Sequence, residues 1–96
     1  MKYNFLVLDK SDNIGVALAA LPKGQSITVA LEPNPHVVVL QDDIPMGHKF
    51  SLTPIALGEA VKKYGSVIGC SIVDIQAGQH VHLHNIESLR GRGDKA

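Results

Sequence analysis

The apolar residues of this chain fall in short runs rather than at helical spacing, and this pattern predicts short β-strands. The runs are rich in Val, Ile and Leu, which suit the half-buried surface of a sheet. Nine glycines and five prolines are spread between them, so that long elements do not fit. We predict strands over residues 4–8, 36–40, 66–73 and 79–84.

Two further segments allow either a helix or a strand. Residues 13–21 contain alanines that suit a helix with Asp12 as its N-cap, but Val and Ile around Gly15 suit a strand equally well. Residues 56–65 are ambiguous in the same way, and Gly65 is suited to end a helix there.

A spaced glycine motif favours strands for both segments. The pattern apolar-x-x-Gly-x-x-apolar occurs four times, and an aspartate precedes two of the copies. A glycine in such a place typically takes a positive φ in a tight turn, after which the chain enters a new strand. The sequence therefore predicts an all-β domain of short hairpins, with room for one short helix. The copies span residues 21–27, 44–50, 55–61 and 75–81, and we assign Gly47, Gly65, Gly69 and Gly78 to turns and backbone geometry.

Length and charge limit the function classes. A chain of 96 residues forms one small domain, which we place at residues 1–86, with a polar and flexible tail at 87–96. The formal net charge of zero argues against nucleic acid and against an electrostatic membrane binder. No stretch reaches the ~20 apolar residues of a membrane span. The single cysteine excludes an intrachain disulfide, which fits a cytoplasmic protein.

Three histidines alternate in the last predicted strand. On a regular strand His80, His82 and His84 share one face, while Val81 and Leu83 point to the core. The outer two histidines are then ~13 Å apart, so that only neighbours such as His80 and His82 can share a metal ion, as an incomplete site. The row is equally interpretable as a solvated strand face, or as imidazoles for acid–base chemistry or anion binding.

Three other polar side chains are candidates for chemistry. His48 and Lys49 directly follow the Gly47 turn, where His48 is suited to bind metal or move protons and Lys49 to hold a carboxylate. Tyr64 precedes Gly65 and has a hydroxyl that can orient a substrate oxygen. The alternatives are an exposed turn for the first two residues and a half-buried hairpin tyrosine for the third.

Three motifs in order carry a family resemblance. The segments "IPMGHK" (44–49), "KYGSVIG" (63–69) and "HVHLHN" (80–85) resemble the SAF domain of altronate and galactarate dehydratases, and the small subunit of sulfolactate sulfo-lyases is similar. The resemblance covers residues 12–85 and implies a β-clip fold, in which short hairpins fold over one another. This expectation agrees with the glycine turns.

The resemblance also implies a function. It indicates a small subunit or N-terminal domain that acts with a large catalytic subunit, which dehydrates a sugar acid to a 2-keto-3-deoxy acid and uses iron(II). We expect this chain to be inactive alone and to supply part of the active site. The expected catalytic residues are His48, Lys49 and Tyr64, and the expected substrate-binding residues are His80, His82, His84 and Asn85.

Three alternatives stay open at this point. The chain can be the small subunit of a sulfo-lyase, which breaks a carbon–sulfur bond. It can be a SAF module that binds a ligand or partner without catalysis, or a free-standing metal-binding protein. An isolated domain with a hydrophobic partner face can also self-associate.

Overall fold

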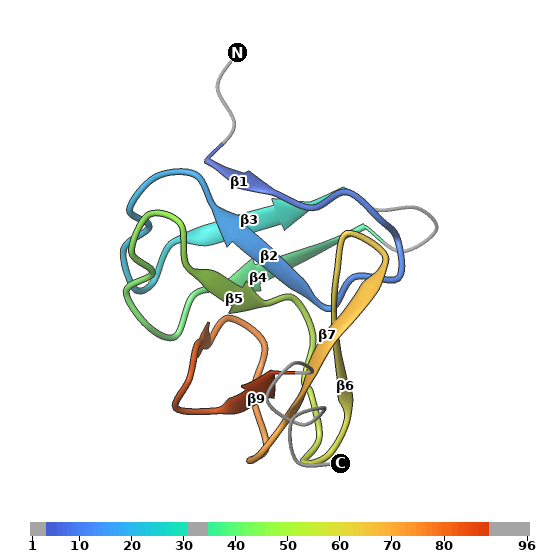
Figure 1. Cartoon of the computed structure of the whole chain (residues 1–96). Coiled ribbons are helices and arrows are strands. Elements are labelled where there is room, and N and C mark those ends of the chain that lie inside the picture. The colour runs from blue at the N-terminus through green and yellow to red at the C-terminus, as the bar shows by residue number, and fades with distance from the viewer. Residues whose placement is uncertain (1–3, 31–34, 89–96) are drawn as a thin grey trace.

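The computed structural model describes residues 4–30 and 35–88, and each regular element in these ranges is a β-strand (Figure 1). This part of the chain has no helix long and apolar enough to cross a membrane. The all-β prediction is confirmed, and the short helix that the sequence allowed does not form in these ranges. The strands are β1 (Phe5–Leu6), β2 (Ile14–Ala17), β3 (Ser26–Val29), β4 (His36–Val39), β5 (Lys49–Ser51), β6 (Ala60–Lys63), β7 (Ser66–Ser71), β8 (His80–Val81) and β9 (Ile86–Ser88).

The strands form three small antiparallel sheets. One sheet has the order β1-β2-β5-β8, β3 pairs with β4, and the third sheet has the order β6-β7-β9. In the view of Figure 1, β6 and β7 lie to the lower right of β1, β2 and β3. Within the described residues no sheet exceeds four strands, so the fold depends on packing between the sheets as well as on pairing within them.

Both ambiguous segments contain strands, β2 and β6. Asp12 caps no helix; its two carboxylate oxygens accept the backbone N–H groups of Gly65 at 2.7 Å and Asp9 at 3.2 Å. Gly65 ends no helix either. It forms a two-residue turn with Tyr64, both at positive φ, between the paired residues Lys63 and Ser66. This is the backbone geometry of the commonest tight β-hairpin.

The glycine-turn prediction is confirmed at all four copies. Gly24, Gly47, Gly58 and Gly78 have φ between +84° and +89°, a region that side chains with a Cβ rarely adopt. Each turn leads into a strand, which is β3, β5, β6 or β8 in turn. The short strands therefore begin where a glycine redirects the chain.

The four turns pair off in two equivalent units. The residue that opens each motif forms an isolated antiparallel bridge with the opening residue of another motif: Leu21 with Ile44, and Ile55 with Ile75. The two aspartates have equivalent roles, because Asp43 accepts the N–H of Lys23 at 2.8 Å and Asp74 accepts the N–H of Leu57 at 2.9 Å. Likewise the N–H of Gly24 donates to Leu40, and that of Gly58 to Ser71. The domain is built as one structural unit used twice.

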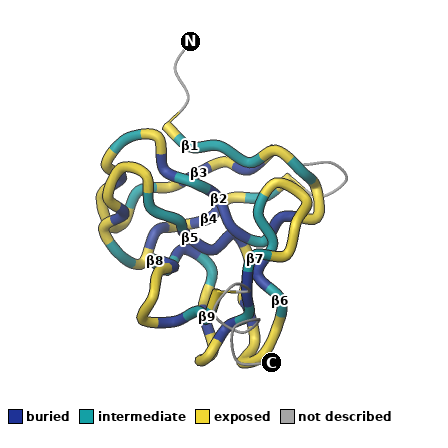
Figure 2. The backbone as a smooth tube through the Cα atoms, in the orientation of Figure 1, coloured by how far each residue is buried: buried dark blue, intermediate teal, exposed yellow. Residues whose placement is uncertain are grey.

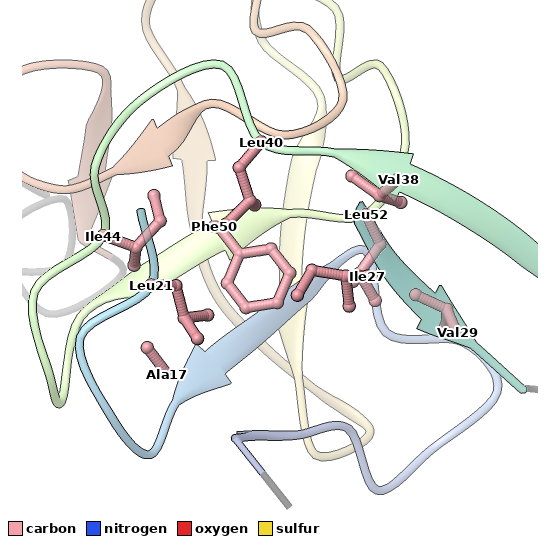
Figure 3. Packing of buried hydrophobic residues seen from close by; sticks show 9 residues of the cluster. All are labelled: Ala17, Leu21, Ile27, Val29, Val38, Leu40, Ile44, Phe50 and Leu52. Carbon is pink, nitrogen blue, oxygen red and sulfur yellow. The ribbon is translucent and has the colours of Figure 1, made fainter. Parts of the chain in front are cut away.

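The four-stranded sheet separates two apolar clusters. Phe50 of β5 is fully buried in the larger one (Figure 3), whereas Val81 of β8 is fully buried in the smaller one. The register explains this, because Phe50 pairs with His80 and the next pair is Lys49 with Val81. Side chains of successive residues in a strand point to opposite faces. His80 therefore shares the face of Phe50, and Lys49 shares the face of Val81.

Several predicted boundaries were wrong. The strand predicted at 4–8 is reduced to Phe5–Leu6, and the one predicted at 79–84 is reduced to His80–Val81. The tail predicted at 87–96 begins too early, because Glu87 and Ser88 belong to β9, which pairs with β7. The rest of that predicted tail lies outside the described residues.

Candidate functional site

His48 and His80 come together across the β5–β8 pair. His48 lies two residues before Phe50, and His80 is the cross-strand partner of Phe50, so both imidazoles lie on the same face of the sheet. His48 Nδ1 and His80 Nε2 are 2.8 Å apart, which is a hydrogen-bond distance. The ring centroids are 5.0 Å apart and the ring planes are inclined by 28°, so the two rings lie side by side.

A turn after β8 brings the other two histidines to this pair. The backbone N–H groups of Asn85 and Ile86 both donate to the carbonyl of His82 at 3.1 Å, which reverses the chain. The His82 ring stacks on His48 with centroids 4.6 Å apart, and the His84 ring lies 5.5 Å from His80. We call His48, His80, His82 and His84 the histidine cluster.

The straight row predicted for these histidines was therefore wrong. A continuous strand would separate His80 from His84 by ~13 Å, but the turn at residues 82–85 folds them together. Leu83 was assigned to the core and is instead 76% exposed, whereas Val81 is fully buried as predicted. Figure 2 shows the turn after β8 as an exposed loop.

The histidine pair shares one hydrogen-bonding proton in its neutral form. One ring nitrogen must donate and the other accept, because each neutral imidazole has one N–H and one lone pair. Whichever ring donates, the two outward nitrogens, His48 Nε2 and His80 Nδ1, then differ: one has a lone pair and the other an N–H. The pair can accept a proton at one end and release one at the other.

Local charges oppose protonation of His80. Burial lowers the pKa of His80, and the like charges of His48, His84 and His82 lower it further, while the carboxylate of Asp42 acts in the opposite direction. The Asp42 carboxylate also accepts the backbone N–H of His80 at 2.9 Å. At neutral pH His80 is therefore held in the neutral form that can accept a proton.

We expect a pH dependence with a defined sign. Because the folded protein binds a proton at His80 less readily than the unfolded chain, this group's contribution to stability is full above the unfolded pKa of ~6.5 and is lost as the pH falls toward the folded pKa. In histidine NMR titrations, His80 should titrate below that ordinary value. Asp42→Asn should lower the pKa of His80 further, since it removes the one charge that raises it and keeps an oxygen acceptor. An unchanged or higher value in this variant would contradict the assignment.

The structure does not place Lys49 and Tyr64 with the cluster. Lys49 lies on the opposite face of the sheet from His48, beside Val81. Burial lowers the pKa of Lys49, and the nearby charge of Lys63 acts in the same direction. Tyr64 lies in the β6–β7 turn, where its ring packs 5.2 Å from the Lys63 ammonium. This arrangement does not support one catalytic group formed by His48, Lys49 and Tyr64.

The described residues do not form an iron site by themselves. In residues 4–30 and 35–88, no three side chains of His, Cys, Asp or Glu are placed to hold one metal ion. His80 and His82, the predicted metal pair, have near-parallel rings with centroids 5.7 Å apart. These residues alone therefore supply an incomplete ligand set for iron.

Sequence reasoning missed one residue of the site, and it did not anticipate the backbone contacts of another. Asp42 contacts His80 from a segment far away in the chain, and no local pattern signals that contact. Asn85 was expected to bind substrate, but it is buried and its amide bonds to the backbone of His82 and His80. The usable signal was asparagine's preference for turns, in which its side chain bonds nearby backbone.

Comparison with known proteins identifies the family of this small β domain. Residues 3–89 match the family described as the altronate/galactarate dehydratase SAF domain, and the chain belongs to this family. It is 44% identical over 81 residues to the altronate dehydratase of Escherichia coli K12, a match that covers 84% of this chain and 16% of that protein. The altronate dehydratase of Bacillus subtilis is 34% identical over 88 residues, also 16% of its length.

A second kind of relative matches along nearly its whole length. The (2R)-sulfolactate sulfo-lyase subunit alpha of Chromohalobacter salexigens is 34% identical over 93 residues, which are 94% of this chain and 99% of that subunit. The same domain is thus part of a much longer protein in some relatives and nearly a whole subunit in another. The family resemblance drawn from the three sequence motifs is confirmed.

Proposed function

We propose that this chain is the SAF subunit or domain of an altronate dehydratase-type hydro-lyase, and that its histidine cluster completes the active site of a large catalytic subunit. The observation that carries the proposal is the hydrogen-bonded pair of His48 and His80 on the domain surface. Membership of the SAF family and the similarity to altronate dehydratases support it. A cytoplasmic location is part of the same expectation.

The proposed chemistry uses the two ends of the histidine pair. Dehydration of a sugar acid removes the proton next to the carboxylate, breaks the carbon–oxygen bond at the neighbouring carbon and releases water, and the enol that forms becomes the 2-keto acid. A bare imidazole nitrogen takes the first proton, and the N–H at the other end gives a proton to the departing hydroxyl. The pair ends with the same number of protons with which it began.

The exposure of the cluster supports a shared site. His82 and His84 are exposed, and His48 and His80 are half-buried, so water reaches the imidazoles. Catalytic electrostatics are stronger where water is excluded. Two exposed apolar residues lie next to cluster histidines in the sequence: Met46, 70% exposed, two residues before His48, and Leu83, 76% exposed, between His82 and His84. A covering subunit would bury these side chains together with the histidines. Iron(II), which the resemblance implies for the assembled enzyme, needs ligands from beyond the described residues.

A sulfo-lyase subunit is the second candidate. The match along 99% of a (2R)-sulfolactate sulfo-lyase subunit alpha favours it. The proton abstraction next to the carboxylate is the same, but the leaving group is sulfite. The two candidates therefore differ in substrate and share the proposed role of the cluster.

Co-purification from the native host, followed by enzyme assays, tests the proposal. The complex should be assayed with altronate, galactarate and sulfolactate, with and without added iron(II). We expect a larger protein to accompany the chain and a 2-keto-3-deoxy acid to form from one sugar acid. Release of sulfite from sulfolactate alone would replace the dehydratase by the sulfo-lyase. A chain that purifies alone and is inert would favour a free-standing binding module.

A further inference from the structure

Asn85 joins the backbone on both sides of the buried Val81. Its side chain is only 3% exposed, although it ends an exposed turn. The amide oxygen accepts the N–H of His82 at 2.9 Å, and the amide nitrogen donates to the carbonyl of His80 at 2.8 Å. One planar group thus fixes the peptide units that carry two of the clustered histidines.

These bonds hold the outer edge of β8, the last strand of its sheet in the described part of the chain. Among residues 4–30 and 35–88, β8 is the last strand of its sheet, and it has only two residues, so no described strand of that sheet pairs with its outer edge. Side chains bind the backbone of His80 there: Asp42 accepts its N–H at 2.9 Å, and Asn85 donates to its carbonyl. Unpaired backbone groups at an edge leave a short strand free to fray. Asn85 and Asp42 prevent this at the residue whose ring pairs with His48.

We propose that Asn85 is a positioning residue that fixes the backbone of His80 and His82 so that their imidazoles pack against His48. This role replaces the substrate contact expected for Asn85, because both ends of its amide are bonded to the protein. The asparagine amide supplies a donor and an acceptor from one short planar side chain. The consequence for catalysis rests on the proposed function, whereas the claim about geometry is independent of it.

The chain contains a matched control in Asn13. Its amide nitrogen donates to the carbonyl of Ala60 at 2.8 Å, and its oxygen accepts the N–H of Lys62 at 2.7 Å. Asn13 thus bonds the backbone on both sides of the buried Val61, as Asn85 does around Val81. Removing either amide takes away one donor–acceptor pair from strand backbone, but only Asn85 bonds to clustered histidines.

Histidine NMR of the full chain, in Asn85→Ala and Asn13→Ala, tests the proposal. Both substitutions should lower the unfolding temperature. Only Asn85→Ala should abolish the protected imidazole N–H signal of the His48–His80 hydrogen bond and raise the pKa of His80 toward its ordinary value. Unchanged histidine signals in Asn85→Ala, or equal changes in Asn13→Ala, would overturn the proposal.

A second substitution of Asn85 and the kinetics of the assembled enzyme complete the test. If Asn85→Ala does not fold, Asn85→Asp keeps the acceptor for His82 and loses the donor to His80, and it should weaken the same N–H signal. In the assembled enzyme, Asn85→Ala should lower kcat more than it raises KM. If the histidine signals change while substitution of the histidines themselves leaves activity intact, the positioning role stands and the proposed function fails.

Discussion

Replacing Gly78 by alanine is expected to destabilise the fold by about 2–5 kcal/mol, a large part of the ~5–15 kcal/mol typical of a small domain. Two causes add. Gly78 has φ +89°, where a residue with a Cβ is strained by ~1–2 kcal/mol. The new Cβ would also lie 2.1 Å from the carbonyl oxygen of Val39, which is backbone and cannot rotate away. Crowding of this kind costs a further ~1–3 kcal/mol.

Gly47 provides the matched control for this experiment. It occupies the equivalent turn of the repeated unit at φ +85°, but a Cβ there meets nothing within 4 Å. Gly47→Ala should therefore cost only the backbone strain of ~1–2 kcal/mol. Urea unfolding of both variants, followed by circular dichroism, measures the difference. Equal losses of stability would show that the Val39 carbonyl moves freely, and would contradict the packing of the β8 turn against β4.

Gly78 also shows why the turns were predictable. Glycine adopts a positive φ far more readily than residues with a Cβ, so a repeated glycine spacing indicates turns without knowledge of the fold. The aspartates before two of the motifs also mark these turns. Asp43 and Asp74 each bond to the glycine turn that forms a β-bridge with the motif following the aspartate. What the spacing did not indicate was the partner of each turn, because those bridges join residues about twenty positions apart.

The candidate site was only partly predictable, for two different reasons. The separation of Lys49 from His48 can be predicted from the sequence alone, because the side chains of adjacent residues in a strand point to opposite faces of the sheet. Applying that rule to the strand after Gly47 would have excluded a shared site. The close approach of the His84 ring to the His80 ring depends instead on where strand β8 ends. The alternation of side chains in the sequence continues through His84, but the strand ends earlier, where the Asn85 side chain bonds to the backbone of His82 and His80.

If this cluster takes part in catalysis, removing one of its histidines should lower the activity of the assembled enzyme. His48→Ala and His80→Ala should each lower kcat/KM by about 10²–10⁴-fold, the range for loss of general acid–base catalysis. His36→Gln is the control, because His36 is the one histidine outside the cluster and bonds to the carbonyl of Leu52. Glutamine keeps a donor for that carbonyl, so activity should stay near that of the unchanged protein.

The double variant decides whether the two histidines act as one unit. If one proton is accepted at one end of the pair and released at the other, removing either ring stops the exchange. Removing both should then cost little more than removing one. Effects that multiply in the double variant would instead indicate two independent roles, such as separate contacts to the substrate. Full activity in all three variants would remove the histidines from the chemistry, and the domain would then be a binding module that holds a partner.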